Sequence, residues 1–212
     1  MRCKKARLSH NRAFLRQKEV LFNGKDMRFI LASASPRRRE LLKKLIDFFE
    51  VQPSQAEEKL SIDDPAQLAR ALASAKCLDV AQRNPGAAVI GADTVVAFGG
   101  RILGKPKDRS DARDTLRLLS GRTHQVYTGV CVAAGGSVRS GVECSEVTFY
   151  PLTEAAIEAY LDTGSPMDKA GSYGIQDGFG IVESYRGDYG NIVGLPAALT
   201  ARLLREAGCP TD

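Results

Sequence analysis

The chain has 212 residues, of which 43% are hydrophobic and 26% are charged, with 20 glycines and 9 prolines. This composition is typical of a globular protein and excludes collagen, a coiled coil and extensive disorder. No apolar run approaches the roughly 18 residues that cross a bilayer, so no membrane span is expected. A length of 212 residues allows one large domain with a substantial core.

The net charge of +5 is concentrated at one end of the chain. Residues 1–26 carry eight Lys or Arg against two acidic residues, whereas residues 27–212 carry a net charge of −1. We expect residues 1–26 to be a basic leader that is disordered or artefactual, and residues 27–212 to form the folded domain. Nucleic-acid binding through the leader is an alternative that the near-neutral domain does not favour.

The five cysteines are dispersed and odd in number. They indicate neither a disulfide framework nor a zinc site, and they favour the reducing environment of the cytoplasm.

From Arg28 onward, β-branched runs alternate with helical patterns, which predicts an α/β domain. Strands are expected at residues 29–33, 88–98, 101–103, 124–134 and 143–150. Helices are expected after the caps Ser35, Asp64, Ser110 and Thr153, and at residues 196–206. The glycine-rich segment 164–194 is too long for an ordinary connection.

Small hydroxyl residues and arginines follow the first expected strand, in the order Ser33-Ala34-Ser35-Pro36-Arg37-Arg38-Arg39. Free N–H groups at a helix start and guanidinium groups both bind anions. Because arginines in a first turn oppose the helix dipole, this pattern favours phosphate binding. A solvated basic face is the alternative.

Asp93 lies inside an apolar run, in the segment Gly91-Ala92-Asp93-Thr94. A carboxylate in such surroundings must be paired, hydrogen-bonded, bound to metal or protonated. This favours a catalytic base or a metal ligand, and the alternative is an aspartate that caps a turn at a strand end.

Two other segments combine charge with glycine, namely Gly104-Lys105-Pro106-Lys107-Asp108 and the run from Asp168 to Gln176. A structural, salt-bridged turn explains the second equally well. Several cations and carboxylates near glycines nevertheless suit a polyphosphate held with a divalent metal. His124 is the only histidine after residue 26, which argues against a histidine triad or a zinc hydrolase.

Six motifs in family order, over residues 28–196 and beyond, resemble those of the Maf family of nucleoside triphosphate pyrophosphatases. They are Leu31-Ala32-Ser33-Ala34-Ser35-Pro36-Arg37-Arg38, Gly91-Ala92-Asp93-Thr94, Ile102-Leu103-Gly104-Lys105-Pro106, Leu119-Ser120-Gly121-Arg122-Thr123-His124, Asp168-Lys169-Ala170-Gly171-Ser172-Tyr173-Gly174-Ile175-Gln176 and Asn191-Ile192-Val193-Gly194-Leu195-Pro196. The leader lies outside the resemblance.

The resemblance implies an α/β fold of the inosine triphosphate pyrophosphatase type, with a mixed central sheet, flanking helices, and two lobes around a deep cleft. It also implies a homodimer, and hydrolysis of a nucleoside triphosphate between its α and β phosphates, with Mg or Mn as the divalent metal. By motif position, Asp93 matches the proton acceptor. The implied phosphate-binding residues are Ser33, Arg38, Lys76, Lys105 and Lys169, and the implied metal ligands are Glu58, Asp93 and Asp168.

Three positions tied to substrate choice read Arg37, Thr94 and Gln176, which resembles the subfamily acting on dTTP and UTP. An amide offers a donor and an acceptor to the edge of a pyrimidine, whereas the glutamate of a sister subfamily suits 7-methyl-GTP. One departure is Ser165, where the family often has glutamate, and we assign it no role. The alternatives are a 7-methyl-GTP pyrophosphatase and a nucleotide-binding regulator of septum formation without significant turnover. The leading hypothesis is a house-cleaning enzyme that removes dTTP, UTP and modified pyrimidine triphosphates from the nucleotide pool, and a link to cell division arrest is a further expectation from the resemblance.

Overall fold

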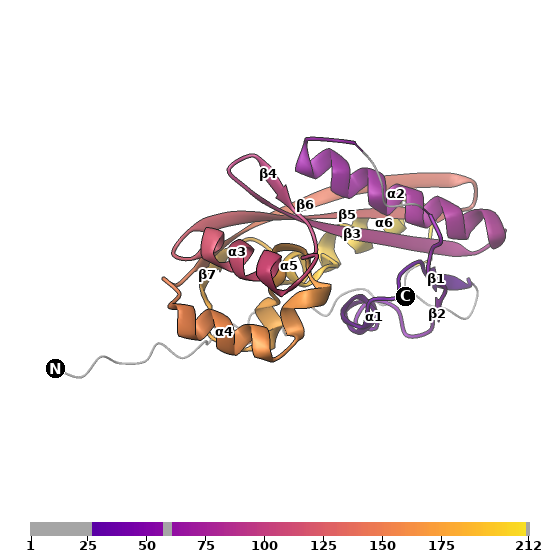
Figure 1. Ribbon diagram of the computed structural model, residues 1–212. Coiled ribbons are helices and arrows are strands. Elements are labelled where there is room, and N and C mark those ends of the chain that lie inside the picture. The colour runs from indigo at the N-terminus through magenta and orange to yellow at the C-terminus, as the bar shows by residue number, and fades with distance from the viewer. Residues whose placement is uncertain (1–26, 57–60, 211–212) are drawn as a thin grey trace.

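The structure is a computed structural model that describes residues 27–56 and 61–210 (Figure 1). The basic leader and Glu58, which the resemblance implies as a metal ligand, lie outside the described residues. Among the described helices, none is long and apolar enough to cross a membrane.

In the described residues, seven strands form one sheet in the order β2-β1-β3-β5-β6-β7, with β4 beside β3. Strand β1 runs parallel to β2 and to β3, and the other pairs are antiparallel. The expected α/β class with a mixed central sheet is therefore confirmed. The strands are β1 (Phe29–Leu31), β2 (Glu50–Val51), β3 (Ala88–Phe98), β4 (Arg101–Leu103), β5 (Thr123–Ala134), β6 (Ser137–Phe149) and β7 (Val182–Arg186).

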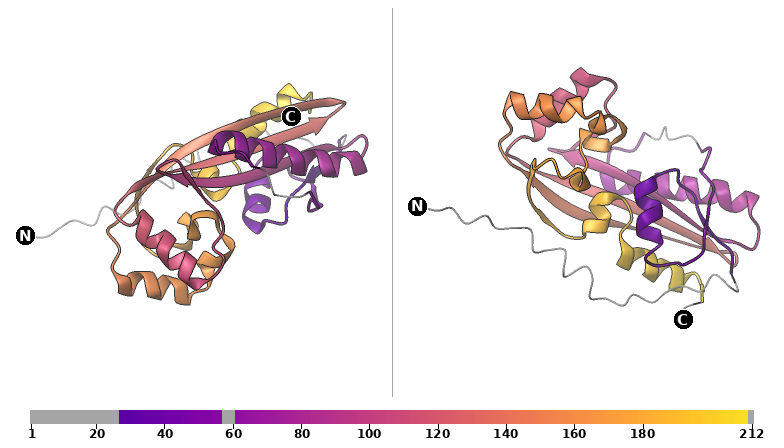
Figure 2. Two further views of the ribbon diagram at one scale, coloured as in Figure 1. Left: turned by 45° about the horizontal axis from the view of Figure 1, so that its top comes forward. Right: turned by 90° about the horizontal axis from the view of Figure 1, so that it is seen from below.

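Helices cover both faces of this sheet. Figure 2 shows α2 on one face, and α1 and α6 on the other. The helices are α1 (Pro36–Leu42), α2 (Pro65–Arg83), α3 (Arg109–Leu119), α4 (Glu154–Asp162), α5 (Tyr189–Val193) and α6 (Ala197–Glu206). The predicted caps Ser35, Asp64 and Thr153 are confirmed. Ser110 is wrong as a cap, because the carboxylate of Asp108 accepts the hydrogen bond at the start of α3.

Strand β1 ends at Leu31, two residues before its predicted end, and the bounds of β6 and the segment 164–194 also differ from the prediction. Strand β6 begins at Ser137, six residues before the predicted start, and its residues 137–142 pair with residues 129–134 of β5. Val138 and Val142 are the only large apolar residues in this half of the strand, so it carries no clear strand pattern. The segment 164–194 contains three 3₁₀ turns, strand β7 and helix α5, with the turns η2 (Ser165–Asp168), η3 (Ala170–Ser172) and η4 (Ile175–Asp177). These elements are too short to show a hydrophobic period in the sequence.

The core on the α1 side of the sheet divides into two clusters. The first joins α1 and α6 to the beginnings of β1 and β3, with Leu42, Ile90 and Leu204 fully buried. The second joins α3 and α4 to the far end of β3 and to β6, through residues such as Val96, Leu116 and Phe149. These clusters are the cores of two lobes, as the family resemblance implies.

One edge of β3 is shared between two partners. Strand β1 pairs with residues 88–90, and β4 pairs with residues 96–98. Among the described residues, no strand pairs with 91–95 on this edge, although β5 pairs along the other edge from Val89 to Ala97. The sheet therefore has a notch at Gly91-Ala92-Asp93-Thr94, between the two lobes.

Two glycines allow α2 to lie unusually close to the sheet. A Cβ at Gly91 would come within 2.5 Å of the Ala73 carbonyl oxygen, and one at Gly129 within 2.2 Å of the Ala69 carbonyl oxygen. Both distances are shorter than any normal contact, so only glycine permits this packing. Helix α2 is thereby held against the notched part of β3.

His124 is part of the second lobe's core and is fully buried. A hydrogen bond of 2.7 Å joins its Nε2 to the Tyr173 hydroxyl, and the rings of Phe149 and Tyr173 lie edge-on to it. Burial lowers the pKa of His124 to about 4, from an ordinary value of 6.5. The imidazole is therefore neutral, and it is a structural residue.

The buried His124 should make the protein less stable as the pH decreases from neutral toward 4. A histidine whose pKa is depressed by folding stabilises the protein fully above its unfolded pKa of 6.5, and this stability is lost as the pH falls toward 4. The free energy of unfolding should be about 2 kcal/mol lower at pH 5 than at pH 7.5. Urea unfolding at both pH values measures the difference, and His124→Gln should remove most of it. An unfolding free energy that is flat over this range would contradict the prediction.

Candidate active site

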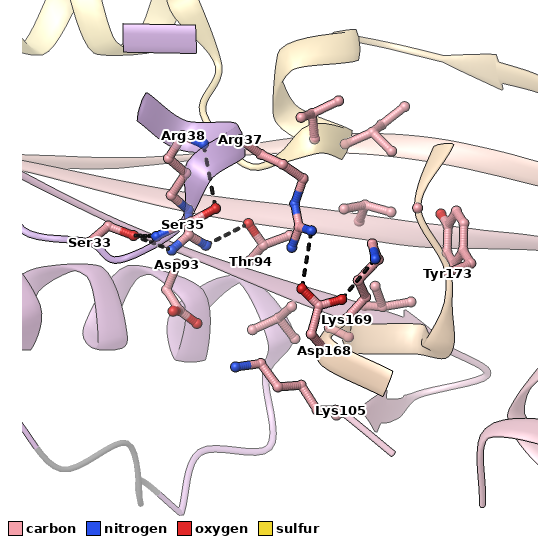
Figure 3. A pocket seen from close by; sticks show the side chains of 18 of the residues that line it. Ser33, Ser35, Arg37, Arg38, Asp93, Thr94, Lys105, Asp168, Lys169 and Tyr173 are labelled. Atoms are coloured by element: carbon pink, nitrogen blue, oxygen red, sulfur yellow. Dashed lines mark hydrogen bonds and ion pairs between the residues drawn. The ribbon is translucent and has the colours of Figure 1, made fainter. Parts of the chain in front are cut away.

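A cavity of about 610 Å³ opens at the notch in the sheet, between the two lobes (Figure 3). Its walls come from β3, α1, α2, the loop after β4, and the turns η2 to η4. All ten of the described residues that sequence analysis selected lie in these walls: Ser33, Arg37, Arg38, Lys76, Asp93, Thr94, Lys105, Asp168, Lys169 and Gln176.

Asp93 lies in the middle of β3, so the alternative in which it caps a turn is wrong. Its carboxylate accepts a hydrogen bond from Lys76 Nζ on α2 and forms an ion pair with it. The side chains of Asp93 and Lys76 are only 15% and 13% exposed. The close approach of α2 thus provides the partner that a half-buried carboxylate requires.

Arg38 joins three segments on the other side of β3. Its guanidinium donates to Ser33 Oγ at 3.3 Å and Thr94 Oγ1 at 3.1 Å, and its Nε donates to the Gly194 carbonyl oxygen at 3.0 Å. Thr94 Oγ1 also lies 3.0 Å from the hydroxyl oxygen of Thr128 in β5. Arg38 therefore fixes the α1 loop and the α5 end against β3, at the wall of the cavity.

A second chain of charges crosses the mouth of the cavity (Figure 3). Arg37 Nη1 donates to Asp168 Oδ2 at 3.3 Å, and Lys169 Nζ donates to Asp168 Oδ1 at 2.7 Å. Partial burial raises the pKa of Asp168, but the hydrogen bonds and charges of Lys169 and Arg37 outweigh it, so the net pKa is below the ordinary value. Asp168 is therefore ionised at neutral pH.

Lys105 reaches the cavity from the loop after β4, which is tied to η3 by a hydrogen bond from the Gly171 N–H to the Gly104 carbonyl. Gln176 reaches it from η4. The arrangement combines five cations with two carboxylates in one concave site. Such a site suits a small polyanion.

The residues present fit a divalent metal that takes most of its ligands from phosphates. Within the described part of the chain, no three His, Cys, Asp or Glu side chains cluster as a complete metal site. Asp93 and Asp168 do line the same cavity, and Mg²⁺ commonly uses one or two carboxylates together with substrate phosphate oxygens.

Comparison with known proteins agrees with the geometry. The family model described as "Maf-like protein" matches residues 28–207. The chain belongs to the Maf family. Among its relatives is a protein of Deinococcus radiodurans named dTTP/UTP pyrophosphatase, which is 53% identical over 85% of this chain and 93% of the relative. Relatives with the same name in Thermococcus kodakarensis and Lacticaseibacillus casei are 50% and 48% identical, over 82% of this chain and 94% and 96% of theirs.

Similarity to solved structures is weaker. The Ham1 protein of Staphylococcus aureus matches with a TM-score of 0.44 and 14% identity, over 58% of this chain and 72% of that chain. The Maf assignment therefore depends on the family match and on the relatives.

Sequence analysis did not select Tyr160, Ser165 or Asp177. Ser165 and Asp177 contact Lys169 or Gln176, and Tyr160 contacts Asp177. Tyr160 has the periodicity of a core residue, and Ser165 and Asp177 belong to a turn-rich segment. No local pattern could reveal that their side chains meet, because the contacts depend on how the turns fold back onto α4.

The Lys76–Asp93 pair provides a test of the site. Removing one member should leave the other charged and half-buried, so Lys76→Met and Asp93→Asn should each lower the free energy of unfolding by about 2–3 kcal/mol. The double variant should lose less than the sum of the two by about 1 kcal/mol or more. Urea unfolding of the three variants at pH 7.5, in the presence of a chelator, measures the coupling. Strictly additive losses would contradict the ion pair.

Proposed function

We propose that this protein is a nucleoside triphosphate pyrophosphatase that hydrolyses dTTP and UTP to the monophosphate and pyrophosphate. The observation that carries the proposal is the notch in β3, where a half-buried aspartate faces a cavity lined by five cations. Family membership and relatives of about 50% identity that are named dTTP/UTP pyrophosphatase support it. Related pyrimidine triphosphates are included in the proposed substrate class.

In this proposal the triphosphate occupies the space between α1 and the loop after β4. Arg37, Lys105 and Lys169 contact phosphate oxygens and compensate the charge that develops on them. Ser33 and Arg38 form the wall at the end of α1, where the hydrogen bonds of Arg38 hold the loop in place. Lys76 completes the phosphate site from α2.

Asp93 is the proposed general base. A water molecule donates a proton to the Asp93 carboxylate as its oxygen forms a bond to the α phosphorus, and the bond from that phosphorus to the bridging oxygen breaks. Pyrophosphate leaves with the electron pair of the broken bond. Lys76 fixes the carboxylate beside the cavity, since its ammonium already holds one of the carboxylate oxygens.

Asp93 and Asp168 are the proposed ligands of Mg or Mn, with Glu58 as a third ligand outside the described residues. When bound, such a cation supplies Lewis-acid polarisation of phosphate oxygens. Asp168 carries its negative charge at neutral pH, and Arg37 and Lys169 hold both of its oxygens at the mouth of the cavity.

Gln176, Arg37 and Thr94 are the proposed determinants of base selection. The Gln176 amide carries a donor and an acceptor, which matches the alternating edge of uracil or thymine. A cytoplasmic location agrees with the free thiols of Cys77, Cys131, Cys144 and Cys209. The homodimer and the link to cell division stay predictions from the resemblance.

Turnover provides the direct test of the proposed function. Wild-type protein with Mg or Mn should release pyrophosphate from dTTP and UTP, and Asp93→Asn should lower kcat by about 10²–10⁴-fold because the proton acceptor is lost. Asp114→Asn is the matched control, since Asp114 is an exposed residue of α3 outside the cavity. No release from any nucleoside triphosphate would overturn the enzyme assignment and leave the binding-protein alternative.

Base selection is tested by Gln176→Glu. A carboxylate only accepts hydrogen bonds, so this change should reduce kcat/KM for dTTP and UTP by about 10-fold or more and improve relative turnover of 7-methyl-GTP. Competition between the three nucleotides measures the selectivity. Unchanged pyrimidine preference would show that Gln176 does not read the base, and preference of the wild type for 7-methyl-GTP would overturn only the choice of substrate.

A further inference from the structure

Asp177 is a half-buried carboxylate at the end of η4, and none of the roles proposed above uses it. Its side chain is 15% exposed, compared with 67% for Asp168. Its two oxygens contact four side chains: Tyr160 on α4, Ser165 in η2, Gln176 in η4, and Lys169 between η2 and η3. Two of these side chains belong to the supporting structure and two line the cavity.

The supporting contacts anchor Asp177 firmly. Tyr160 on α4 and Ser165 in η2 each donate a hydroxyl hydrogen bond of 2.6 Å to Asp177 Oδ2. The Tyr160 hydroxyl also accepts the Gly174 N–H at 2.9 Å. Hydrogen bonds to a charged acceptor are the strong ones among side chains, so α4 fixes both Asp177 and the loop that precedes it.

The other two contacts reach the cavity walls. Gln176 Nε2 donates to Asp177 Oδ1 at 3.3 Å, so the carboxylate orients the Gln176 amide by attracting its nitrogen. Lys169 Nζ lies 3.8 Å from Asp177 Oδ2 and donates to Ser165 Oγ at 2.9 Å. Ser165 thus bridges the ammonium and the carboxylate, because its hydroxyl accepts from Lys169 and donates to Asp177.

Gly174 explains how these groups come so close together. A Cβ at this position would lie 2.6 Å from Gln176 Nε2, 2.7 Å from Asp177 Oδ1 and 2.8 Å from Lys169 Cε. The three side chains are therefore packed around the backbone of one glycine, and a movement of one displaces the others.

We propose that Asp177, held by Tyr160 and Ser165, is a positioning residue that sets the Lys169 ammonium and the Gln176 amide for the triphosphate and for the base. One carboxylate thereby couples the phosphate end of the site to the base end. Lys169 has two carboxylate neighbours with different surroundings: Asp168 is exposed at the cavity mouth, whereas Asp177 is enclosed behind the lysine. When Asp168 engages a ligand, Asp177 and Ser165 still hold the ammonium.

The inference rests on the proposed function, and Asp177→Asn tests it. The amide has the same shape but no charge, and it replaces one acceptor oxygen by a donor, so either Lys169 or Gln176 loses its acceptor. We expect kcat/KM for dTTP and UTP to fall about 10-fold or more, and the preference for pyrimidines over purines to narrow. Asp162→Asn, on the exposed end of α4, is the matched control and should leave both unchanged.

Rescue distinguishes positioning from a merely structural role. In Ser165→Glu/Asp177→Asn, the new carboxylate replaces a hydroxyl that contacts Lys169, so we expect it to restore a charge beside Lys169 and not beside Gln176. This double variant should recover most of the lost kcat/KM for dTTP and UTP, whereas the preference for pyrimidines over purines should stay weak. Tyr160→Phe keeps the ring in the core and removes only the hydroxyl. It should reduce kcat/KM and the pyrimidine preference less than Asp177→Asn does, and it replaces Asp177→Asn as the test if that variant fails to fold.

Binding of a non-hydrolysable α,β-methylene analogue of dTTP is measured alongside turnover. If wild-type protein hydrolyses no triphosphate, the proposed function fails, and weaker binding of the analogue by Asp177→Asn still supports the positioning role. The inference would be overturned if a folded Asp177→Asn variant had the same turnover, selectivity and analogue binding as the wild-type protein. An equal loss of kcat/KM in Asp177→Asn and in Ser165→Glu/Asp177→Asn would also overturn it.

Discussion

Strand β3 pairs with β1 at its beginning and with β4 at its end, and the five residues between have no strand beside them on that edge within the described chain. Hydrogen bonding to β5 along the opposite edge keeps these residues extended although one edge is open. The notch therefore places the backbone and side chains of Gly91-Ala92-Asp93-Thr94 at a cavity without breaking the strand. One lobe consists of the elements that pack around the beginning of β3, and the other consists of those that pack around its end.

Successive side chains of β3 point to opposite faces of the sheet, and this alternation divides the site into two parts. Asp93 faces α2, where Lys76 compensates its charge, and Thr94 faces the opposite side, where it accepts from Arg38. Successive side chains of a strand point to opposite faces, so a single motif serves both sides of the sheet. Gly91 and Gly129 are equally necessary, because a bulkier residue would push α2 and its lysine away from Asp93.

The sequence predicted this site better than it predicted the segment that encloses it. Asp93 was recognisable because a carboxylate in an apolar run must have a partner, and α2 and β3 had clear caps, turns and periodicity. Lys169 and Gln176 were recognisable through a motif. The contacts of Asp177 with Tyr160 and Ser165 depend instead on the fold of three short 3₁₀ turns, whose conformation follows from tertiary packing rather than from local preference. The first half of β6 escaped prediction because Val138 and Val142 are its only large apolar residues, so residues 137–142 carry no clear strand pattern.

The distribution of charge also explains why a near-neutral domain can attract a highly charged molecule. Residues 27–212 have a net charge of −1, yet the cavity walls carry five cations and two carboxylates. A concave site concentrates this local excess of positive charge, and the field acts on a ligand small enough to enter. The two carboxylates are each held by cations, Asp93 by Lys76, and Asp168 by Arg37 and Lys169. Asp177 adds a third carboxylate, which lies behind Lys169 on the side away from the cavity. The carboxylates thus hold the cations of the cavity wall in place and reduce the repulsion between them.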